Sequence, residues 1–334
     1  MRRSGTERAF LPRRARGGGG LAVVALALLA GCGGGGETPA GGPDKPLTSV
    51  GISVGSLRNP YHAAIARGAD TAARRLNPTV QVTTTGDEYS ALKQAEQIDA
   101  FVAAHTDLIV LVPADAEQIG DAIARARQAG ATVVTVDAPA LGADAEVAGD
   151  NIATGAVACR ALAEAMGGHG QVAILGGPPS PVATARALGC ADALSRVPDI
   201  HVAAPDADGK GTQEGGQRAM RDLFAGAGQI DGVFAITDAE ALGAADAAAQ
   251  LGRNLLVVAP EGSPAMEAAL ANRARAGVIA TAALDPYRMG GNAVRVGQDV
   301  RNGRAPEAEE RLLDPALVTR ESVHDYKGWL AERE

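Results

Sequence analysis

Aromatic residues and cysteine are both scarce in this chain of 334 residues. Aromatics make up 3% of the sequence and Trp329 is the one tryptophan, so few rings are available to stack on a ligand. Apart from Cys32 near the N-terminus, the cysteines are Cys159 and Cys190, which both lie in alanine-rich helical patterns. The residues leave two interpretations open: one disulfide, or two small buried apolar side chains.

Motifs for several kinds of chemistry are missing as well. The five histidines are scattered without metal-ligand spacing, so no metal site is expected among His62, His105, His169, His201 and His324. No G-x-S-x-G turn occurs and neither later cysteine is near a histidine, so no activated nucleophile is predicted. The glycines of VGISVGS (50–56) and GGPPSP (176–181) fit neither a dinucleotide motif nor a phosphate loop, and no cofactor is expected.

The N-terminus has the composition of an export signal. An arginine-rich start, the apolar run LAVVALALL and the tetrapeptide Leu29-Ala30-Gly31-Cys32 are typical of a lipoprotein signal peptide over residues 1–31. The run is shorter than the roughly 20 residues of a membrane span. Residues 32–46 are rich in glycine and proline and predict a flexible tether. We expect an extracytoplasmic protein anchored to the cell membrane by a lipid on Cys32; the alternatives are an ordinary signal or a membrane helix with a chance cysteine.

Charge and length narrow the function further. Residues 1–31 hold six arginines and one glutamate, a net of +5, so their removal changes the formal charge from −8 to −13. Nucleic acid is not expected as a partner of so acidic a chain. About 290 residues follow the tether, which is more than one core usually serves, so two domains are predicted.

From Leu47 onward, short β-branched runs alternate with alanine-rich amphipathic stretches. SVGISV, VQVTTT, LIVLV and TVVTVD predict strands, and the segments between them predict helices. Strands that are apolar on both faces indicate a parallel sheet covered by helices on both sides. The same rhythm restarts after Gly149. We therefore expect an α/β protein of two doubly wound lobes, with a ligand cleft between them.

Several motifs in a fixed order carry a family resemblance: the tetrapeptide at Cys32, VGISVGSLRNPYHAAIARGADTAA, LIVLVPADAEQIGDAIARARQAGATVVTVDAP, the GDN at 149–151, DGVFAITDAEALGA, VVAPEGSP and DPYRMGG. Over residues 48–320 the chain resembles periplasmic sugar-binding proteins of the ribose-binding type. The resemblance implies the type I periplasmic-binding fold, with two lobes joined by a three-strand hinge. It places an N-terminal lobe at 47–149 plus 285–313 and a C-terminal lobe at 150–284 plus 314–334.

The resemblance also implies which residues form the site. The expected ligand-binding residues are Asn59, Tyr61, His62, Asp137, Arg186, Thr237, Asp238 and Glu261, and the expected hinge residues are Asp150, Asn151, Leu284 and Asp285. A structural role is the alternative for several of these residues. Asn59 is also suited to cap a helix that starts at Pro60, and Asp137 to a turn before Ala138.

The chain departs from the ribose-binding pattern at several of these positions. Ala138, Leu188 and Leu284 replace an arginine, a second arginine and a glutamine, and DADGKGTQEGG lacks the aromatic residue that should stack on the ligand. Ribose itself is therefore not expected. The carboxylates at Asp137, Asp238, Glu261 and Asp285 favour a sugar or polyol, or alternatively an amine, over an acid or a phosphate.

These features predict a solute-binding protein, not an enzyme, that is monomeric and delivers a small polar ligand to an ABC permease by closing its hinge. Two alternatives stay open: a lipoprotein that presents its closed form to a membrane sensor, and an exported α/β enzyme. A repressor with the same core is disfavoured, because an export signal occupies the place of a DNA-binding domain.

Overall fold

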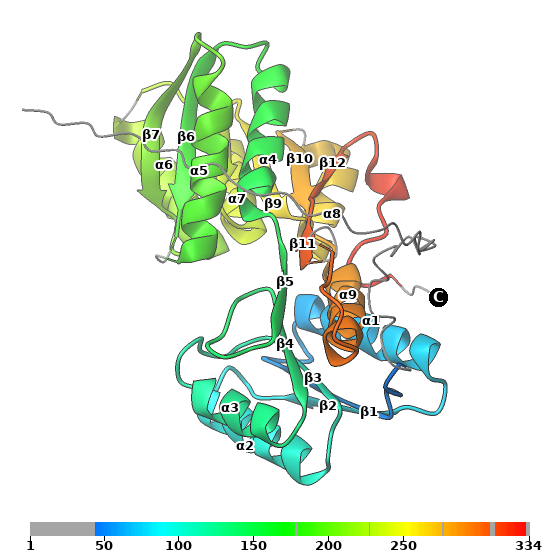
Figure 1. Ribbon diagram of the computed structural model, residues 1–334. Coiled ribbons are helices and arrows are strands. Elements are labelled where there is room, and N and C mark those ends of the chain that lie inside the picture. The colour runs from blue at the N-terminus through cyan, green and yellow to red at the C-terminus, as the bar shows by residue number, and fades with distance from the viewer. Residues whose placement is uncertain (1–43, 178–179, 227, 276, 308–310, 332–334) are drawn as a thin grey trace, which may run out of the picture. The chain divides into compact units, whose positions relative to one another are not determined.

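Two six-stranded sheets organise the chain (Figure 1). The computed structural model describes residues 44–331 apart from 178–179, 227, 276 and 308–310, and these residues belong to one unit, Gly41–Glu334. The predicted signal peptide, Cys32 and most of the tether lie outside the described residues. Within the described part, no helix has the length and apolar character needed to cross a membrane.

The first sheet is parallel throughout, with strand order β11-β5-β4-β3-β1-β2. Its strands are β1 (Ser49–Val54), β2 (Gln81–Gly86), β3 (Leu108–Leu111), β4 (Thr132–Val136), β5 (Ala145–Gly149) and β11 (Leu312–Leu313). Helices α1 (Pro60–Leu76) and α9 (Pro286–Arg301) pack on one face, and α2 (Ala91–Ala103) and α3 (Gly120–Gln128) pack on the other. We call this sheet with its helices the N-terminal lobe.

The second sheet repeats the same order, β12-β10-β9-β8-β6-β7, with β12 antiparallel to β10. Its strands are β6 (Gly170–Gly176), β7 (Ile200–Asp208), β8 (Gly232–Ala235), β9 (Leu256–Glu261), β10 (Val278–Ala283) and β12 (Ala316–Thr319). We call it, with the helices that cover it, the C-terminal lobe. The predicted class, two doubly wound α/β lobes, is confirmed.

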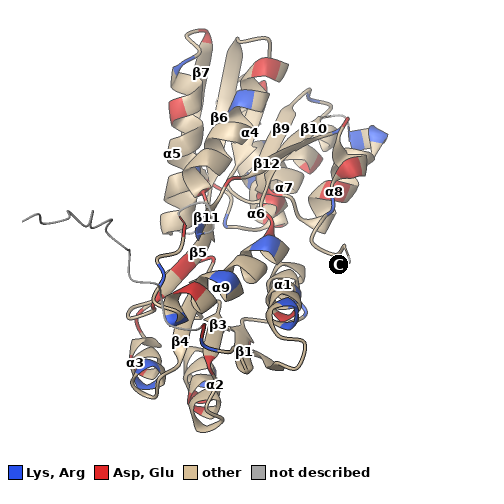
Figure 2. Cartoon of the chain, turned by 45° about the vertical axis from the view of Figure 1, so that its right-hand side comes forward, with Lys and Arg blue, Asp and Glu red and all other residues tan. Residues whose placement is uncertain are grey.

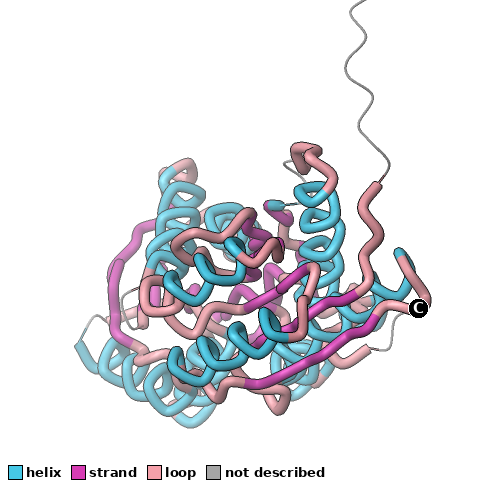
Figure 3. Tube along the Cα trace, turned by 60° about the horizontal axis from the view of Figure 1, so that its bottom comes forward, coloured by secondary structure: helices cyan, strands magenta, loops and turns pink. Residues whose placement is uncertain are grey.

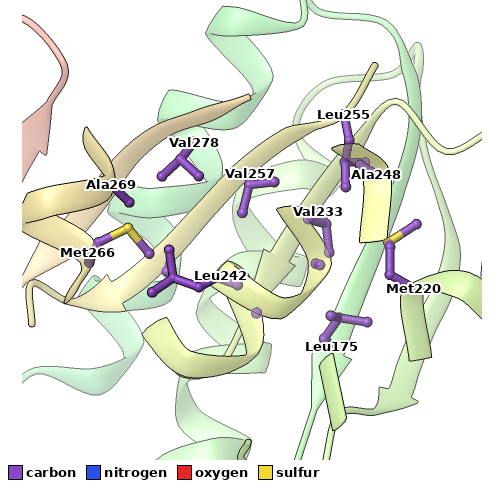
Figure 4. Packing of buried hydrophobic residues seen from close by; sticks show 14 of the residues in the cluster. Leu175, Met220, Val233, Leu242, Ala248, Leu255, Val257, Met266, Ala269 and Val278 are labelled. Atoms are coloured by element: carbon purple, nitrogen blue, oxygen red, sulfur yellow. The ribbon is translucent and has the colours of Figure 1, made fainter. Parts of the chain in front are cut away.

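Helices cover the second sheet on both faces. The tube view shows helices lying beside strands in the described part of the chain (Figure 3). Helices α4 (Asn151–Ala165) and α5 (Pro181–Ser195) lie on one face. The other face packs against α6 (Gln213–Gly226), α7 (Asp238–Gln250) and α8 (Pro264–Ala271). Figure 4 shows the apolar core between these three helices and the second sheet, where Met220, Leu242 and Met266 from the helices pack against Val233 and Val257 from the strands. Short 3₁₀ turns lie at η1 (Arg273–Arg275) and η2 (Val323–Asp325).

The chain crosses between the lobes at three places, after β5, after β10 and between β11 and β12. The crossings pack on one another. The backbone N–H of Asp150 donates to the carbonyl of Leu313 at 2.9 Å, and a Cβ added at Gly149 would lie 2.6 Å from Leu284. Glycine at 149 therefore lets two hinge strands approach closely.

Four helices begin in the same way. Asn59, Ser180, Ser263 and Asp285 each cap a helix whose first residue is proline, and each side chain accepts a backbone N–H of the first turn. Such caps satisfy donors that the helix itself leaves unpaired, and proline loses nothing at that position. The sequence-based cap at Asn59 is thereby confirmed as a local feature.

Helices α4 and α5 approach so closely that only glycine fits at their contact. A Cβ on Gly155 would lie 1.9 Å from the carbonyl oxygen of Arg186, and one on Gly189 would lie 2.0 Å from that of Ile152. Cys159, one turn after Gly155, and Cys190, next to Gly189, form a disulfide with both side chains fully buried. Of the two interpretations of the cysteines, the disulfide is the one that the structure contains.

Candidate functional site

A cavity of about 500 Å³ receives residues from both lobes. Its lining is Asn59, Tyr61, Asp137, Ser180, Val182, Ala183, Arg186, Gly211, Ile236, Thr237, Glu261 and Trp329. Most of these residues follow the carboxyl ends of strands or begin the helices after them, where ligands bind in open α/β sheets. A ligand here would contact both lobes at once.

The N-terminal lobe contributes a phenol and a carboxylate. The hydroxyl of Tyr61 donates to Oδ1 of Asp137 at 2.7 Å. Burial and then the charge of Asp137 raise the pKa of Tyr61 well above its usual value, so the phenol stays protonated. Asn59 lies beside them, where its Oδ1 accepts from the N–H of Tyr61 and its Nδ2 donates to the hydroxyl of Tyr89 at 3.2 Å.

The C-terminal lobe contributes a guanidinium and a carboxylate. Arg186 on α5 donates to Oε1 of Glu261 at 2.8 Å, and two further hydrogen bonds tie it to Asn151 Oδ1 and the carbonyl of Ile236. Burial disfavours the charge of Arg186, yet attraction to Glu261 outweighs it and the pKa is raised. Arg186 is 5% exposed and stays charged, and its bonds use Nε and Nη1 while Nη2 has no hydrogen bond within the described residues.

Both carboxylates occupy strained backbone positions. Asp137 has φ +74° and Glu261 has φ +86°, the left-handed region that non-glycine residues rarely adopt. Each follows or ends the strand at the same place of its sheet, β4 and β9. Such strain is kept where the surrounding structure over-determines it, commonly at binding sites.

Two more carboxyl groups lie behind the C-terminal side of the cavity. Burial, and then the charge of Glu261, raises the pKa of Asp238 well above its usual value; Oδ2 of Asp238 accepts from the N–H of Ser263. Burial also raises the pKa of Glu240 to about 7. Oε1 of Glu240 accepts from the N–H of Gly211 at 2.7 Å and Oε2 from the hydroxyl of Thr237 at 3.0 Å. Glu240 thus supports two residues of the lining.

The structure brings together six of the eight residues expected to bind ligand: Asn59, Tyr61, Asp137, Arg186, Thr237 and Glu261. His62 and Asp238 do not line the cavity. Nδ1 of His62 accepts from the N–H of Ser56, and burial lowers the pKa of the ring. Asp238 is 2% exposed, and its carboxyl group accepts a hydrogen bond from the backbone N–H of Ser263. The side chains of His62 and Asp238 therefore hold loops in place instead of lining the cavity.

The expected hinge residues lie at the crossings. Asp150 caps α4 and Asp285 caps α9. The Oδ1 atom of Asn151 accepts a hydrogen bond from Nε of Arg186. Leu284 is 3% exposed and packs against Gly149, so the residue that replaces glutamine contributes no polar group to a ligand.

Sequence reasoning missed six lining residues: Ser180, Val182, Ala183, Gly211, Ile236 and Trp329. Those at 180–183 lie within two turns of Arg186 on α5, a helical spacing that could have revealed them. Trp329 gave no such signal, because its place depends on the path of the chain after β12.

A larger hollow of about 810 Å³ lies along α1 and α9, on which Figure 2 shows basic residues in blue. Its lining includes Arg75, Arg288 and Arg295 and comes mainly from these two helices. Closing the lobes would not enclose a ligand there, so the smaller cavity is the stronger candidate site. Among the described residues, no group of three or more His, Cys, Asp or Glu could hold a metal ion.

Known proteins similar to this chain are binding proteins. A family model described as periplasmic binding protein domain matches residues 50–305. The ribose import binding protein of Bacillus subtilis is 28% identical over 269 residues, covering 80% of this chain and 86% of that protein. The xylitol-binding protein of Mycolicibacterium smegmatis is 30% identical over 234 residues, covering 69% of this chain and 65% of that protein.

A solved structure shows the same fold. It is the periplasmic solute-binding protein of an ABC transporter from Actinobacillus succinogenes with bound D-allose. The TM-score is 0.72 at 23% identity, and the match covers 84% of this chain and 100% of that one. At that identity the likeness extends to the fold, and the ligand has to be argued from the cavity.

Proposed function

The chain belongs to the periplasmic binding protein domain family, and on that premise we propose that it captures a neutral sugar or polyol between its lobes and delivers it to an ABC importer. It is a binding protein and not an enzyme. The observation that carries the proposal is the cavity lined from both lobes, with Asp137 on one side and Arg186 on the other. Relatives named for ribose import and for xylitol binding support the same ligand class.

The charges of the lining favour a neutral ligand. Asp137 and Glu261 are two carboxylates against the single guanidinium of Arg186, so an acid or phosphate would meet a net negative wall. A hydroxyl can donate to Asp137 while another accepts from Nη2 of Arg186. The uncompensated charge of Asp137 also suits a protonated amine, which is the second ligand class to test.

Closure of the lobes on a ligand requires only that the ligand bind the closed form more tightly than the open form. A ligand that bonds to both lobes contacts the closed form more than the open one, and its binding energy shifts the population toward closure. A dissociation constant on the order of 1 μM corresponds to about 8 kcal/mol. We take 47–149 with 285–313 and 150–284 with 314–334 as the two moving bodies, because each set holds the strands of one sheet. Asp150, Asn151, Leu284 and Asp285 serve as the hinge.

The test is a thermal-shift screen over sugars, polyols, amines and sugar acids, followed by X-ray scattering with the best binder. We expect a neutral polyol or sugar to raise the melting temperature and to reduce the radius of gyration. A chain that binds none of these compounds, or whose radius of gyration is unchanged at saturation, would contradict the proposal.

For location, we propose an extracytoplasmic protein anchored through a lipid on Cys32 and monomeric in solution. The apolar run before Cys32 and the glycine-rich residues after it support this assignment. Metabolic labelling with a fatty acid should mark the wild-type chain and not Cys32→Ala; equal labelling of both would rule the anchor out.

A further inference from the structure

The segment after β12 returns from the C-terminal lobe to the N-terminal lobe. Tyr326 still belongs to the C-terminal lobe, where its hydroxyl donates to the carbonyl of Gly262 at 2.8 Å. Three residues later, the carbonyl of Trp329 accepts a hydrogen bond from Nη2 of Arg67 on α1. Figure 1 shows this segment, in red, running from β12 toward α1. This segment is thereby hydrogen-bonded to both lobes.

The indole of Trp329 lies at the cavity and is fixed in orientation. Its ring centroid lies 5.0 Å from that of Tyr61, with the planes at 69°. Its Nε1 donates to the carbonyl of Leu284 in the hinge at 3.3 Å. An edge-on ring contact and a hydrogen bond together fix the orientation of the ring.

Trp329 is a buried apolar residue that lies outside the packed clusters of both lobes. The side chain is 7% exposed, yet none of the four buried apolar clusters of the described residues includes it. It lies instead among the lining, together with Tyr61. These two are the aromatic residues of the lining, and the hydroxyl of Tyr61 already bonds to Asp137.

We propose that Trp329 is a ligand-binding residue, which offers its apolar ring to the C–H groups of the sugar or polyol held between Asp137 and Arg186. The inference rests on the proposed function. Sugars and polyols present C–H faces between their hydroxyls, and rings bury such faces without leaving a polar group unpaired. The C-terminal segment thus supplies the ring that the C-terminal lobe's own loops lack.

The first test measures affinity by titration calorimetry with xylitol and D-ribose as probes. Trp329→Leu keeps apolar volume and removes the ring, so the probe that binds the wild-type chain should bind this variant roughly tenfold more weakly. Trp329→Phe keeps a ring and should stay within about threefold of wild type. Leu330→Ala, at a neighbouring side chain that is 60% exposed, is the control and should bind as wild type does.

The second test needs no variant, because the chain has one tryptophan and its fluorescence reports on position 329 alone. Saturating probe should change the emission and reduce quenching by acrylamide by roughly half, since the ligand would cover the ring. This measurement decides the matter where the leucine variant does not fold.

The outcomes separate the two proposals. A probe that binds wild type and Trp329→Leu within twofold, or, if that variant does not fold, leaves acrylamide quenching unchanged, overturns the role of Trp329 and leaves the proposed function standing. If neither xylitol nor D-ribose binds the wild-type chain, the titration uses the sugar or polyol that the thermal-shift screen identifies. If the screen identifies none, the proposed ligand class fails, and the inference fails with it.

Discussion

Each lobe places a carboxylate at the same point of its sheet, but the partner of that negative charge differs between the lobes. Asp137 follows β4 and accepts from the neutral phenol of Tyr61, whereas Glu261 ends β9 and pairs with the guanidinium of Arg186. In both lobes the partner comes from the helix that follows the first strand of that sheet, α1 or α5. The same architecture therefore leaves one carboxylate charged toward the cavity and neutralises the other.

This difference assigns distinct tasks to the two pairs. Glu261 uses both oxygens within the protein, accepting from Arg186 and from the N–H of Asp238, so it mainly orients the guanidinium. Asp137 uses Oδ1 for Tyr61, and its other oxygen has no hydrogen bond within the described residues. Under the proposed function, the second oxygen of Asp137 and Nη2 of Arg186 are the groups that the two lobes offer to a ligand.

The largest effect, on stability and binding together, is expected from Arg186→Met. The change leaves the buried carbonyl of Ile236 without its donor and Glu261 without its counter-charge. Because the Glu261 side chain is 24% exposed, we expect a loss of about 3 kcal/mol, at the lower end of the cost of breaking a buried pair. Urea unfolding should show that loss, and calorimetry should show no ligand binding. The double variant Arg186→Met/Glu261→Gln should recover part of the stability and none of the binding. A loss of unfolding free energy below about 1 kcal/mol in the single variant would mean that the Arg186–Glu261 pair contributes no more than an exposed ion pair.

The next effect concerns the close helix pair of each lobe, which a disulfide crosslinks in the C-terminal lobe. Helices α1 and α9 approach through Gly68 and Gly290 as α4 and α5 do through Gly155 and Gly189, but the described residues contain a disulfide at the second pair alone. Replacing both cysteines by alanine should cost about 3.7 kcal/mol, because the crosslink closes a loop of 31 residues.

Hydrogen exchange locates the effect of removing the disulfide. Protection should fall in α4 and α5 and remain unchanged in α1 and α9. Equal losses in both helix pairs would show that the lobes unfold together, and that the disulfide stabilises the whole chain.

A third contrast lies between two of the chain's three Asp-Ala-Glu tripeptides, the one at 115–117 and the one at 238–240. Glu117 in the N-terminal lobe is exposed, whereas Glu240 in the C-terminal lobe is fully buried and has a pKa of about 7. The folded state thus binds the proton of Glu240 more tightly than the unfolded state does. Its stabilising contribution is complete below the unfolded pKa near 4.5 and is lost as the pH rises through 7.

Glu240→Gln removes the charge while its amide oxygen can still accept from the N–H of Gly211, and its amide nitrogen can donate to the hydroxyl of Thr237 instead of accepting from it. Between pH 4.5 and 8 the wild-type chain should lose on the order of 3 kcal/mol relative to this variant. Glu117→Gln is the matched control and should leave the pH dependence of unfolding unchanged. If Glu240→Gln follows the wild-type curve throughout, the carboxyl group does not titrate in this range.

Tyr61→Phe is expected to have the smallest effect. It removes one hydrogen bond to a carboxylate that borders the cavity and can be reached by water, so the loss of stability should be about 1 kcal/mol. Ligand affinity should fall far less than in Arg186→Met. A loss as large as that of Arg186→Met would show that the two pairs are equivalent, against the comparison drawn above.

The sequence predicted the local parts of this structure well. Strands followed from β-branched runs, and the carboxylates at 137 and 261 were expected in the cleft because strand ends of a parallel sheet meet at one edge. Asn59 was recognised as a cap from its neighbour Pro60. These are features in which a residue and its neighbours along the chain determine the outcome.

Features that depend on packing between distant segments were not predicted. The direction of His62 depends on the turn at Ser56, and the pairing of the cysteines depends on the close approach of α4 and α5. Helix α6 starts in a glycine-rich segment that gave little helical signal. Trp329 reaches the cavity only because the tail crosses to Arg67, which no local pattern could indicate.

The most direct test of the account compares the affinity of the wild-type chain for xylitol with that for its acid, xylonate, by calorimetry at pH 7. The lone charge of Asp137 predicts that the neutral polyol binds and that the acid binds at least about tenfold more weakly, a difference that Asp137→Asn should reduce. Xylonate binding as tightly as xylitol would contradict the assignment of Asp137 and Arg186 to opposite sides of a neutral ligand.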